Sequence, residues 1–208
     1  MRPVHALALL TLALAACNAE RTADTGADPT AGAVDAIEAI EPVTEPAGAA
    51  DAIPPSGDAR MDGYGSIEFG MTAEEARADW NGNPLELAGD PGDGSACHHL
   101  GPAGQATPAQ LAFMFENDLF VRYSAESSEI TAPGGGRVGM DEAALQGLYG
   151  DRLAVAPHKY VKGGKMLMSA EDGGNLPSRL FFELDADGRV TSWRVGLAPQ
   201  IGYVEGCR

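Results

Sequence analysis

The sequence predicts an α+β fold of two tandem units, each a short helix followed by an antiparallel meander, forming a layered sheet with the helices on one face. All aromatic residues lie after residue 63, so only the later part of the chain can build a sizeable core. In that part, a pattern of extended segment, Gly-Met pair and helix start occurs twice, each time followed by two strand-like runs. We therefore expect a first unit over residues 61–130 and a second unit, with a C-terminal strand, over residues 131–208.

The first residues resemble a bacterial lipoprotein signal peptide. Arg2 precedes an apolar run of about 11 residues, which is too short to cross a bilayer but matches a signal-peptide core. The run ends in Leu-Ala-Ala-Cys17, which resembles the lipobox whose cysteine is lipidated and becomes the first mature residue. The alternative is an ordinary secretory signal that contains a stray cysteine. We expect a signal peptide over residues 1–16 and acyl chains such as palmitate on Cys17, and Asn18 implies the outer membrane by resemblance to such lipoproteins.

The next segment is predicted to be an acidic tether. Residues 18–60 carry nine acidic side chains, two arginines, no lysine and no aromatic residue. Such a composition cannot bury enough apolar surface to offset the entropy of the chain. We expect the lipidated cysteine and a disordered tether over residues 17–60.

Equivalent capping residues mark the starts of the two predicted helices. Thr72 follows the first Gly-Met pair, and Asp141 follows the second. Thr72 together with Glu75 forms a capping-box pattern, in which side chain and backbone satisfy each other's hydrogen bonds. Each helix is expected to end on an aromatic residue that precedes a glycine, Gly82 in the first unit and Gly150 in the second.

Two β-hairpins are predicted from alternating apolar runs. The first joins residues 112–116 to residues 120–123, and the second joins residues 179–183 to residues 190–194. Asp187-Gly188 is a strong turn signal in the second hairpin.

This order of elements, with its Gly-Met-Thr-x-x-Glu opening, resembles the SmpA/OmlA-type lipoproteins and the tandem-repeat β-lactamase inhibitory protein. The resemblance implies helices on one face of an antiparallel sheet and an open second face for a partner. The whole layout also resembles a group of uncharacterised proteobacterial lipoproteins, through its lipobox, Gly-Gly-Gly-Arg-Val-Gly-Met, Pro-His-Lys-Tyr-Val and Tyr-Val-Glu-Gly-Cys segments. Members of that group are sometimes labelled lectins, but the sequence contains no sugar-binding motif that would carry the label.

The cysteines predict a structural disulfide. If Cys17 is lipidated, Cys97 and Cys207 remain as an even pair in an oxidising compartment. The alternative, an exposed reactive thiol pair, lacks a Cys-x-x-Cys motif or a basic flank.

No metal, cofactor or catalytic site is predicted. His98 and His99 are neighbours on a strand, so their side chains point to opposite faces and do not readily chelate one ion. The Gly-x-Gly-x-x-Gly match at residues 134–139 has no βαβ continuation. The acidic turn at residues 183–188 places Arg194 where a calcium loop requires glutamate. Nothing resembles a Ser- or Cys-based catalytic arrangement in the required context.

The predicted binding surface is the sheet face that the helices leave open. Alternation along the strands places a set of large apolar, aromatic and basic side chains on or beside that face. A register slip of one residue, or cover from the other unit or from residues 157–160, would remove them from it. The candidate binding residues are Met114, Arg122, Tyr123, Phe181, Trp193 and Arg194.

These observations predict a non-catalytic binding module that is anchored by lipid in the bacterial outer membrane and faces the periplasm. The net charge of −16 argues against nucleic acid as a partner, because phosphate binding needs a basic footprint. The expected partners are the membrane, through the lipid, and an envelope protein or glycan. The alternatives are a carbohydrate-binding, lectin-like lipoprotein and a structural accessory of outer-membrane assembly.

Overall fold

The computed structural model describes residues 52–89, 96–172 and 175–207. The chain divides into two compact units, residues 1–44 and residues 45–208, and all described residues belong to the second. The predicted signal peptide, the lipidated Cys17 and most of the predicted tether lie outside the described residues.

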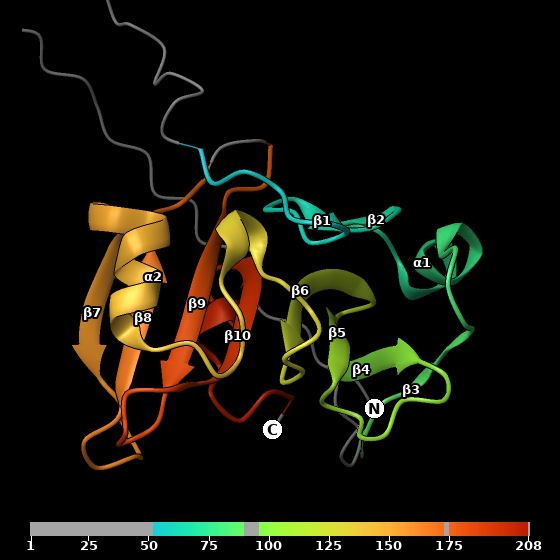
Figure 1. Cartoon of the computed structure of the whole chain (residues 1–208). Helices are drawn as coiled ribbons and strands as arrows, with labels where there is room; N and C mark the ends of the chain where they lie inside the picture. Colours follow the sequence, from blue (N-terminus) through green and yellow to red (C-terminus); the bar gives the residue numbers. More distant parts are fainter. Residues whose placement is uncertain (1–51, 90–95, 173–174, 208) are drawn as a thin grey trace, which may run out of the picture. The chain divides into compact units, whose positions relative to one another are not determined.

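One antiparallel sheet of eight strands dominates the described part of the chain (Figure 1). A second sheet contains only the short strands β1 (Gly63–Tyr64) and β2 (Ile67–Glu68). The large sheet is continuous because β6 pairs with β10, which joins the earlier four strands to the later four. In spatial order its strands are β3 (Leu85–Leu87), β4 (Cys97–Pro102), β5 (Leu111–Glu116), β6 (Leu119–Ala125), β10 (Val190–Leu197), β9 (Ser178–Leu184), β8 (Lys165–Ser169) and β7 (Leu153–Pro157).

The helices are short, and their caps are those expected from the sequence. In α1 (Ala73–Asp79), Thr72 accepts a hydrogen bond from the Glu75 backbone while the Glu75 carboxylate accepts one from the Thr72 backbone, which completes the capping box. The Asp141 carboxylate caps α2 (Glu142–Tyr149) by accepting a hydrogen bond from the Ala144 backbone, without the reciprocal bond of a capping box. Three 3₁₀ turns complete the set: η1 (Pro133–Gly135), η2 (Gly150–Arg152) and η3 (Gln200–Gly202).

The predicted α+β class of two tandem helix-plus-meander units is wrong. The described chain is mostly β, since α1 and α2 contain only 7 and 8 residues against the eight strands of the main sheet. The strands do not form two separate meander units, because the β6–β10 ladder and a shared core merge them into one sheet. The repeated Gly-Met motifs mark where helices start, but helices of two turns cannot set the fold class.

Both predicted hairpins are present within that sheet. β5 and β6 turn through Asn117 and Asp118, both with positive φ, as a tight hairpin connection requires. β9 and β10 turn through Asp185–Gly188, where the Asp185 carboxylate accepts hydrogen bonds from the Asp187 and Arg189 backbones.

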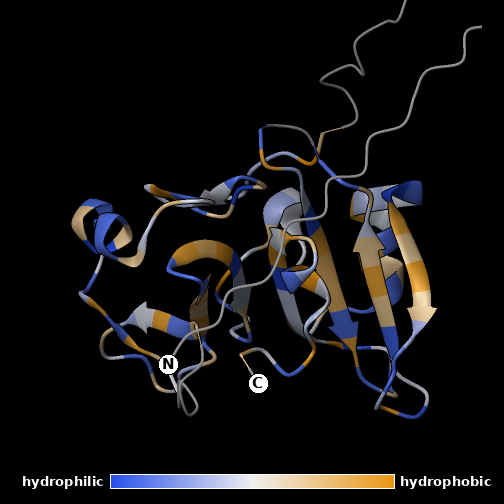
Figure 2. Ribbon diagram, turned by 180° about the vertical axis from the view of Figure 1, so that it is seen from behind, coloured by the Kyte–Doolittle hydropathy of each residue, from blue (hydrophilic) through white to orange (hydrophobic). Residues whose placement is uncertain are grey.

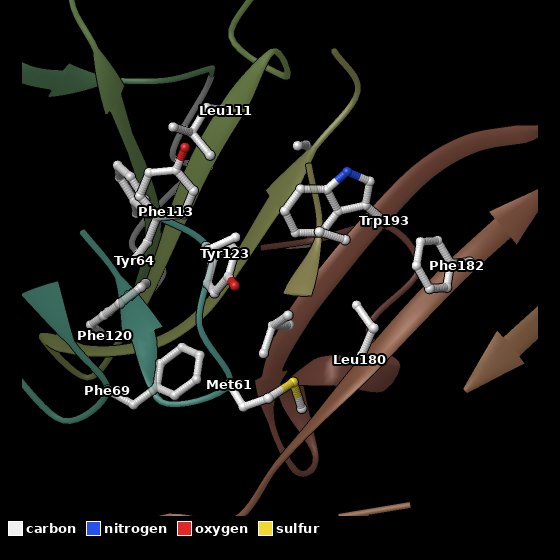
Figure 3. Close-up of a cluster of buried hydrophobic side chains, with 14 of the residues drawn as sticks. Met61, Tyr64, Phe69, Leu111, Phe113, Phe120, Tyr123, Leu180, Phe182 and Trp193 are labelled. Atoms are coloured by element: carbon white, nitrogen blue, oxygen red, sulfur yellow. The ribbon is translucent and has the colours of Figure 1, made fainter. Parts of the chain in front are cut away.

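A continuous aromatic core covers one face of the sheet, here called the core face (Figure 3). Across the β6–β10 ladder, the rings of Tyr123 and Trp193 meet edge to face at a centroid distance of 5.7 Å. Tyr123 also donates a hydrogen bond to the carbonyl oxygen of Arg60, which ties the N-terminal segment to the sheet. Side chains from β1, β2, α1 and α2 close this core, among them Tyr64, Ile67, Ala76, Leu145 and Tyr149.

The opposite face of the sheet, here called the back face, is covered at its centre by the C-terminal segment, residues 198–207. The predicted disulfide between Cys97 and Cys207 is confirmed and attaches the end of this segment to β4. Met114 and Val121 are buried around it, with Tyr203 packed against them. The segment thus forms a second, smaller apolar cluster.

A buried arginine holds the same segment. Arg122 Nη1 donates to the carbonyl oxygens of Gln200, at 3.0 Å, and Tyr203, at 2.6 Å. Gly196 on β10 leaves room for it, because a Cβ atom there would lie 2.8 Å from Arg122 Cβ. Burial, together with the nearby charge of Arg194, lowers the pKa of Arg122 from 12.5 to about 9.

The start of the described chain belongs to the core. Ile53 and Ala59 are buried, although the sequence places them in the tether. The backbone N–H of Ile53 donates to the Asp172 carboxylate, and Ala59 forms bridges with Ser56 and Tyr64. Packing against the sheet therefore begins by Ile53.

His99 gives the C-terminal segment a pH dependence. A Cβ atom on Gly206 would lie 3.1 Å from the His99 ring, so the ring lies against this segment. Burial, reinforced by the charges of Arg122 and His98, lowers the pKa of His99 from 6.5 to about 4. The folded protein keeps His99 neutral, whereas the unfolded chain takes up a proton near pH 6.5. Above that pH the ring is neutral in both states and its titration contributes nothing, and as the pH falls from 6.5 toward 4 proton uptake by the unfolded chain lowers the stability of the fold.

We predict that His99→Asn makes the free energy of unfolding less dependent on pH. Between neutral pH and pH 4, the wild-type protein should lose about 3 kcal/mol more stability than the variant, as a pKa shift of this size implies. Urea unfolding at a series of pH values measures the difference. Parallel pH profiles for the two proteins would contradict the assignment.

Candidate functional site

The six residues predicted to form an open binding surface are all buried. Met114, Tyr123 and Trp193 have no exposed surface, and Arg122, Arg194 and Phe181 are only 5–6% exposed. Tyr123 and Trp193 lie in the aromatic core, whereas the C-terminal segment lies against Met114, Arg122 and Arg194. The prediction fails for two reasons: Tyr123 and Trp193 point to the core face, and the chain covers the centre of the back face with its own end. The Cys97–Cys207 pair was the signal in the sequence, since it attaches that end to a strand of the same sheet.

An open surface exists instead at the edge of the sheet. β7 is the last strand in the order, so among the described residues β8 alone pairs with it (Figure 1). Leu153 is buried, but the four residues that follow it are exposed. Figure 2 shows the outermost strand in mainly hydrophobic colours. An apolar strand with a free edge can accept another strand.

The register shows which backbone groups of β7 face outward. The N–H of His158 donates to the carbonyl oxygen of Gly164, in the register that β7 and β8 share. Because inward and outward pointing alternate along an antiparallel strand, Ala154 and Ala156 point their backbone groups toward β8. Leu153, Val155 and Pro157 then point theirs to the free edge. Pro157 lacks an N–H, which costs nothing at an outward position.

The loop that follows β7 is basic. All three lysines of the chain, Lys159, Lys162 and Lys165, lie within seven residues of one another. Lys165 forms an ion pair with Glu142 of α2 at 2.5 Å. Of the ion pairs between described residues, none involves Lys159 or Lys162. Residues 158–165 are called the lysine loop below. The sequence itself carries this signal, because the three lysines stand out in a chain of net charge −16.

Apolar side chains accompany these charges. Val155 is 45% exposed, Tyr160 68% and Val161 38%, so three of the large exposed apolar side chains cluster on this surface. A groove of about 240 Å³ runs beside them, lined by Val155, Ala156, Pro157, Gly163, Gly164 and Lys165. We call β7 and the lysine loop together the edge surface. Exposed tyrosine and valine beside cations suit a protein interface.

A chain of polar contacts, buried at its inner end, positions the lysine loop. His158 Nδ1 accepts hydrogen bonds from the backbone N–H groups of Tyr160 and Val161, both at 3.1 Å. The ring proton therefore sits on Nε2, which lies 3.7 Å from the Glu183 carboxylate. Glu183 in turn pairs with Arg194 at 2.7 Å. His158 and Arg194 have side chains that are only 6% exposed, so solvent screens these contacts weakly.

A second hollow lies beside Trp80, where α1 ends. It measures about 450 Å³ and is lined by Gly57, Asp58, Arg60, Gly65, Ser66, Trp80, Asn81 and Gly82. The indole N–H of Trp80 donates to the carbonyl oxygen of Asn83, and its ring packs on Phe113 at a centroid distance of 5.2 Å. The hollow thus combines an anchored aromatic ring with carboxylate, amide and guanidinium groups. In the sequence, Trp80 is the aromatic residue before Gly82 at the end of the first predicted helix, and nothing there indicates a hollow beside it.

Nothing in the described part of the chain forms a metal centre. Within residues 52–89, 96–172 and 175–207, no three His, Cys, Asp or Glu side chains are placed to share an ion. Among the same residues, no helix has the length and apolar character needed to cross a membrane.

Comparisons with known proteins do not define a family. No family model matches the chain, and no curated protein matches it. Among solved structures, the chain is similar to an extracellular protein containing a SCP domain from Bacillus anthracis strain Ames, with 10% identity and a TM-score of 0.40. The alignment covers 69% of this chain and 47% of the other, so the chain spans about half of that protein's length.

We predict that His158→Ala loosens the lysine loop. The backbone N–H groups of Tyr160 and Val161 lose their acceptor, which should lower the free energy of unfolding by about 1–3 kcal/mol. Amide hydrogen exchange at Tyr160 and Val161 should accelerate. Tyr160→Ala is the matched control, because it removes an exposed side chain and leaves the acceptor in place. Unchanged exchange in His158→Ala would contradict the positioning role of His158.

Proposed function

We propose that this protein is a non-catalytic binding module of the bacterial cell envelope, anchored through lipid on Cys17, and that it holds a protein partner on the edge surface. The observation that carries the proposal is the free, apolar β7 strand beside a cluster of lysines and an exposed tyrosine. Protein interfaces favour tyrosine anchors beside apolar contacts, with charged groups at the rim.

The composition of the rest of the surface supports the same choice. The strands present their large apolar side chains mainly to the core or to the C-terminal segment. Leu87, which is 60% exposed, lies on β3 at the other edge of the sheet. That strand has three residues against the five of β7, and no lysine lies near it in sequence. β7 is therefore the longer of the two edge strands, and it is the one with positively charged side chains beside it in an otherwise acidic chain.

The proposed anchor suits a partner in the same envelope compartment. Lipid chains confine the protein to the membrane surface, and two or more of them bind stably because each buried methylene contributes about 0.8 kcal/mol. We propose an outer-membrane anchor that faces the periplasm.

Photo-crosslinking in intact envelopes tests the proposal. With a photo-reactive amino acid in place of Tyr160, we predict a reproducible adduct with a protein. The same amino acid in place of Leu87 should give about five-fold less of that adduct or none, since contacts cluster at interface anchors. Failure to obtain an adduct at Tyr160, or equal yields at both positions, would contradict a protein partner on the edge surface.

A second candidate function, carbohydrate binding, is favoured by the hollow beside Trp80. Its aromatic ring, together with Asp58 and Asn81, matches the needs of a sugar, which stacks on an apolar ring face and hydrogen-bonds at its edges. Trp193 and Tyr123 cannot serve this purpose, because both are fully buried.

A glycan array on the purified protein tests this second candidate. A true site predicts binding that Asn81→Ala weakens by about ten-fold, the worth of one well-made polar contact. Asn81 is exposed, so this variant should fold normally, whereas Trp80→Ala would also disturb the core. Absence of any glycan signal above background would eliminate carbohydrate as the ligand.

A further inference from the structure

We propose that β7 binds an extended, acidic polypeptide segment as an added strand, with Lys159 and Lys162 recognising its carboxylates. This inference rests on the proposed function and specifies its binding mode and its partner's chemistry. Strand addition to a free sheet edge is a general mode of peptide recognition, in which backbone hydrogen bonds give affinity and side chains give specificity.

The backbone of β7 supplies a defined set of hydrogen-bonding groups. The shared register of β7 and β8 leaves Leu153 and Val155 with outward N–H and C=O groups, and Pro157 with an outward C=O. An added strand can therefore receive two N–H donors and offer its own to three carbonyl oxygens. Pro157 closes the ladder at one end, so the docked segment pairs with residues 153–157.

The charge of the lysine loop selects an acidic segment. Residues 157–165 contain three lysines and no acid, in a chain that carries 30 acidic residues. Lys165 is already neutralised by Glu142, so Lys159 and Lys162 remain to attract carboxylates.

The groove beside β7 adds a requirement for an apolar side chain. Its lining by Val155, Ala156, Pro157, Gly163, Gly164 and the stem of Lys165 is mainly apolar, and about 240 Å³ is enough for one aliphatic or aromatic side chain. Because alternate residues of a strand face the same side, the segment should alternate acidic and apolar residues.

A peptide probe tests the inference on the purified full-length protein with Cys17→Ser. We predict that a labelled peptide of about eight residues, alternating Glu and Val, binds about ten-fold more tightly than its Lys-Val counterpart. Val155→Pro removes an outward N–H but none that faces β8, so it should abolish binding while circular dichroism stays unchanged. Val155→Ala is the matched control, because it trims the groove but keeps the outward N–H, and it should weaken binding far less than Val155→Pro does.

A second variant keeps the test independent of any folding defect in Val155→Pro. Lys159→Glu with Lys162→Glu changes only exposed loop residues and should reverse the preference between the two peptides. Equal binding of both peptides to the parent, no binding of either, or unchanged binding to Val155→Pro would each overturn strand addition. A dimer that Val155→Pro dissociates would also overturn it, since a second copy would then occupy the edge. If any of these results occurs together with a protein adduct at Tyr160, a protein partner on the edge surface is still supported. Only binding by addition of an acidic strand is then rejected.

Discussion

The ion pair between Glu183 and Arg194 holds two parts of the back face in place. One is the C-terminal segment, and the other is the His158 ring that positions the lysine loop. Arg194 Nη1 lies 2.7 Å from the Glu183 carboxylate, while its Nε donates to the carbonyl oxygen of Ile201 in the C-terminal segment. The other carboxylate oxygen of Glu183 faces His158, which holds the lysine loop. The guanidinium also covers the ring of Phe181, 4.0 Å from its centroid. One pair on neighbouring strands thus fixes a covering segment on one side and an exposed loop on the other.

Such a pair is costly to bury, and its contacts explain why it can persist. Taking two charges out of water costs several kcal/mol per ion unless close pairing and further hydrogen bonds compensate. Here compensation comes from the carbonyl oxygen of Ile201, the ring of Phe181 and the proton on His158. Each compensating group belongs to a different element, so losing one weakens the hold on the others. The consequence for function is that the centre of the back face is covered, while β7 and the lysine loop stay exposed.

Local features of this fold were predictable, but the larger arrangement was not. Alternation located both hairpins, capping chemistry located both helix starts, and cysteine parity located the disulfide, since each is a short-range rule. The fold class was wrong because strand order is a long-range property: nothing in β6 or β10 alone says that they pair. The binding residues were wrong for a related reason. A period of two separates the faces of a strand without saying which face the rest of the chain covers.

The edge surface was missed because its strand signal is weak. Leu-Ala-Val-Ala-Pro contains one β-branched residue and a proline, a composition with little strand propensity. The cluster of three lysines is visible in the sequence. It indicates a docking site only once the sheet order shows that a free strand edge lies beside it. The sequence could therefore indicate an unusual loop, and only the sheet order identifies it as a candidate docking surface.

Amide hydrogen exchange along β7, with and without the acidic peptide, tests the central claim most directly. Binding at the free edge should slow exchange at Leu153 and Val155, whose N–H groups point outward. It should leave Ala154 and Ala156 nearly unchanged, because their N–H groups are already paired with β8. Protection that appears away from β7, or equally on both sets of amides, would contradict the account.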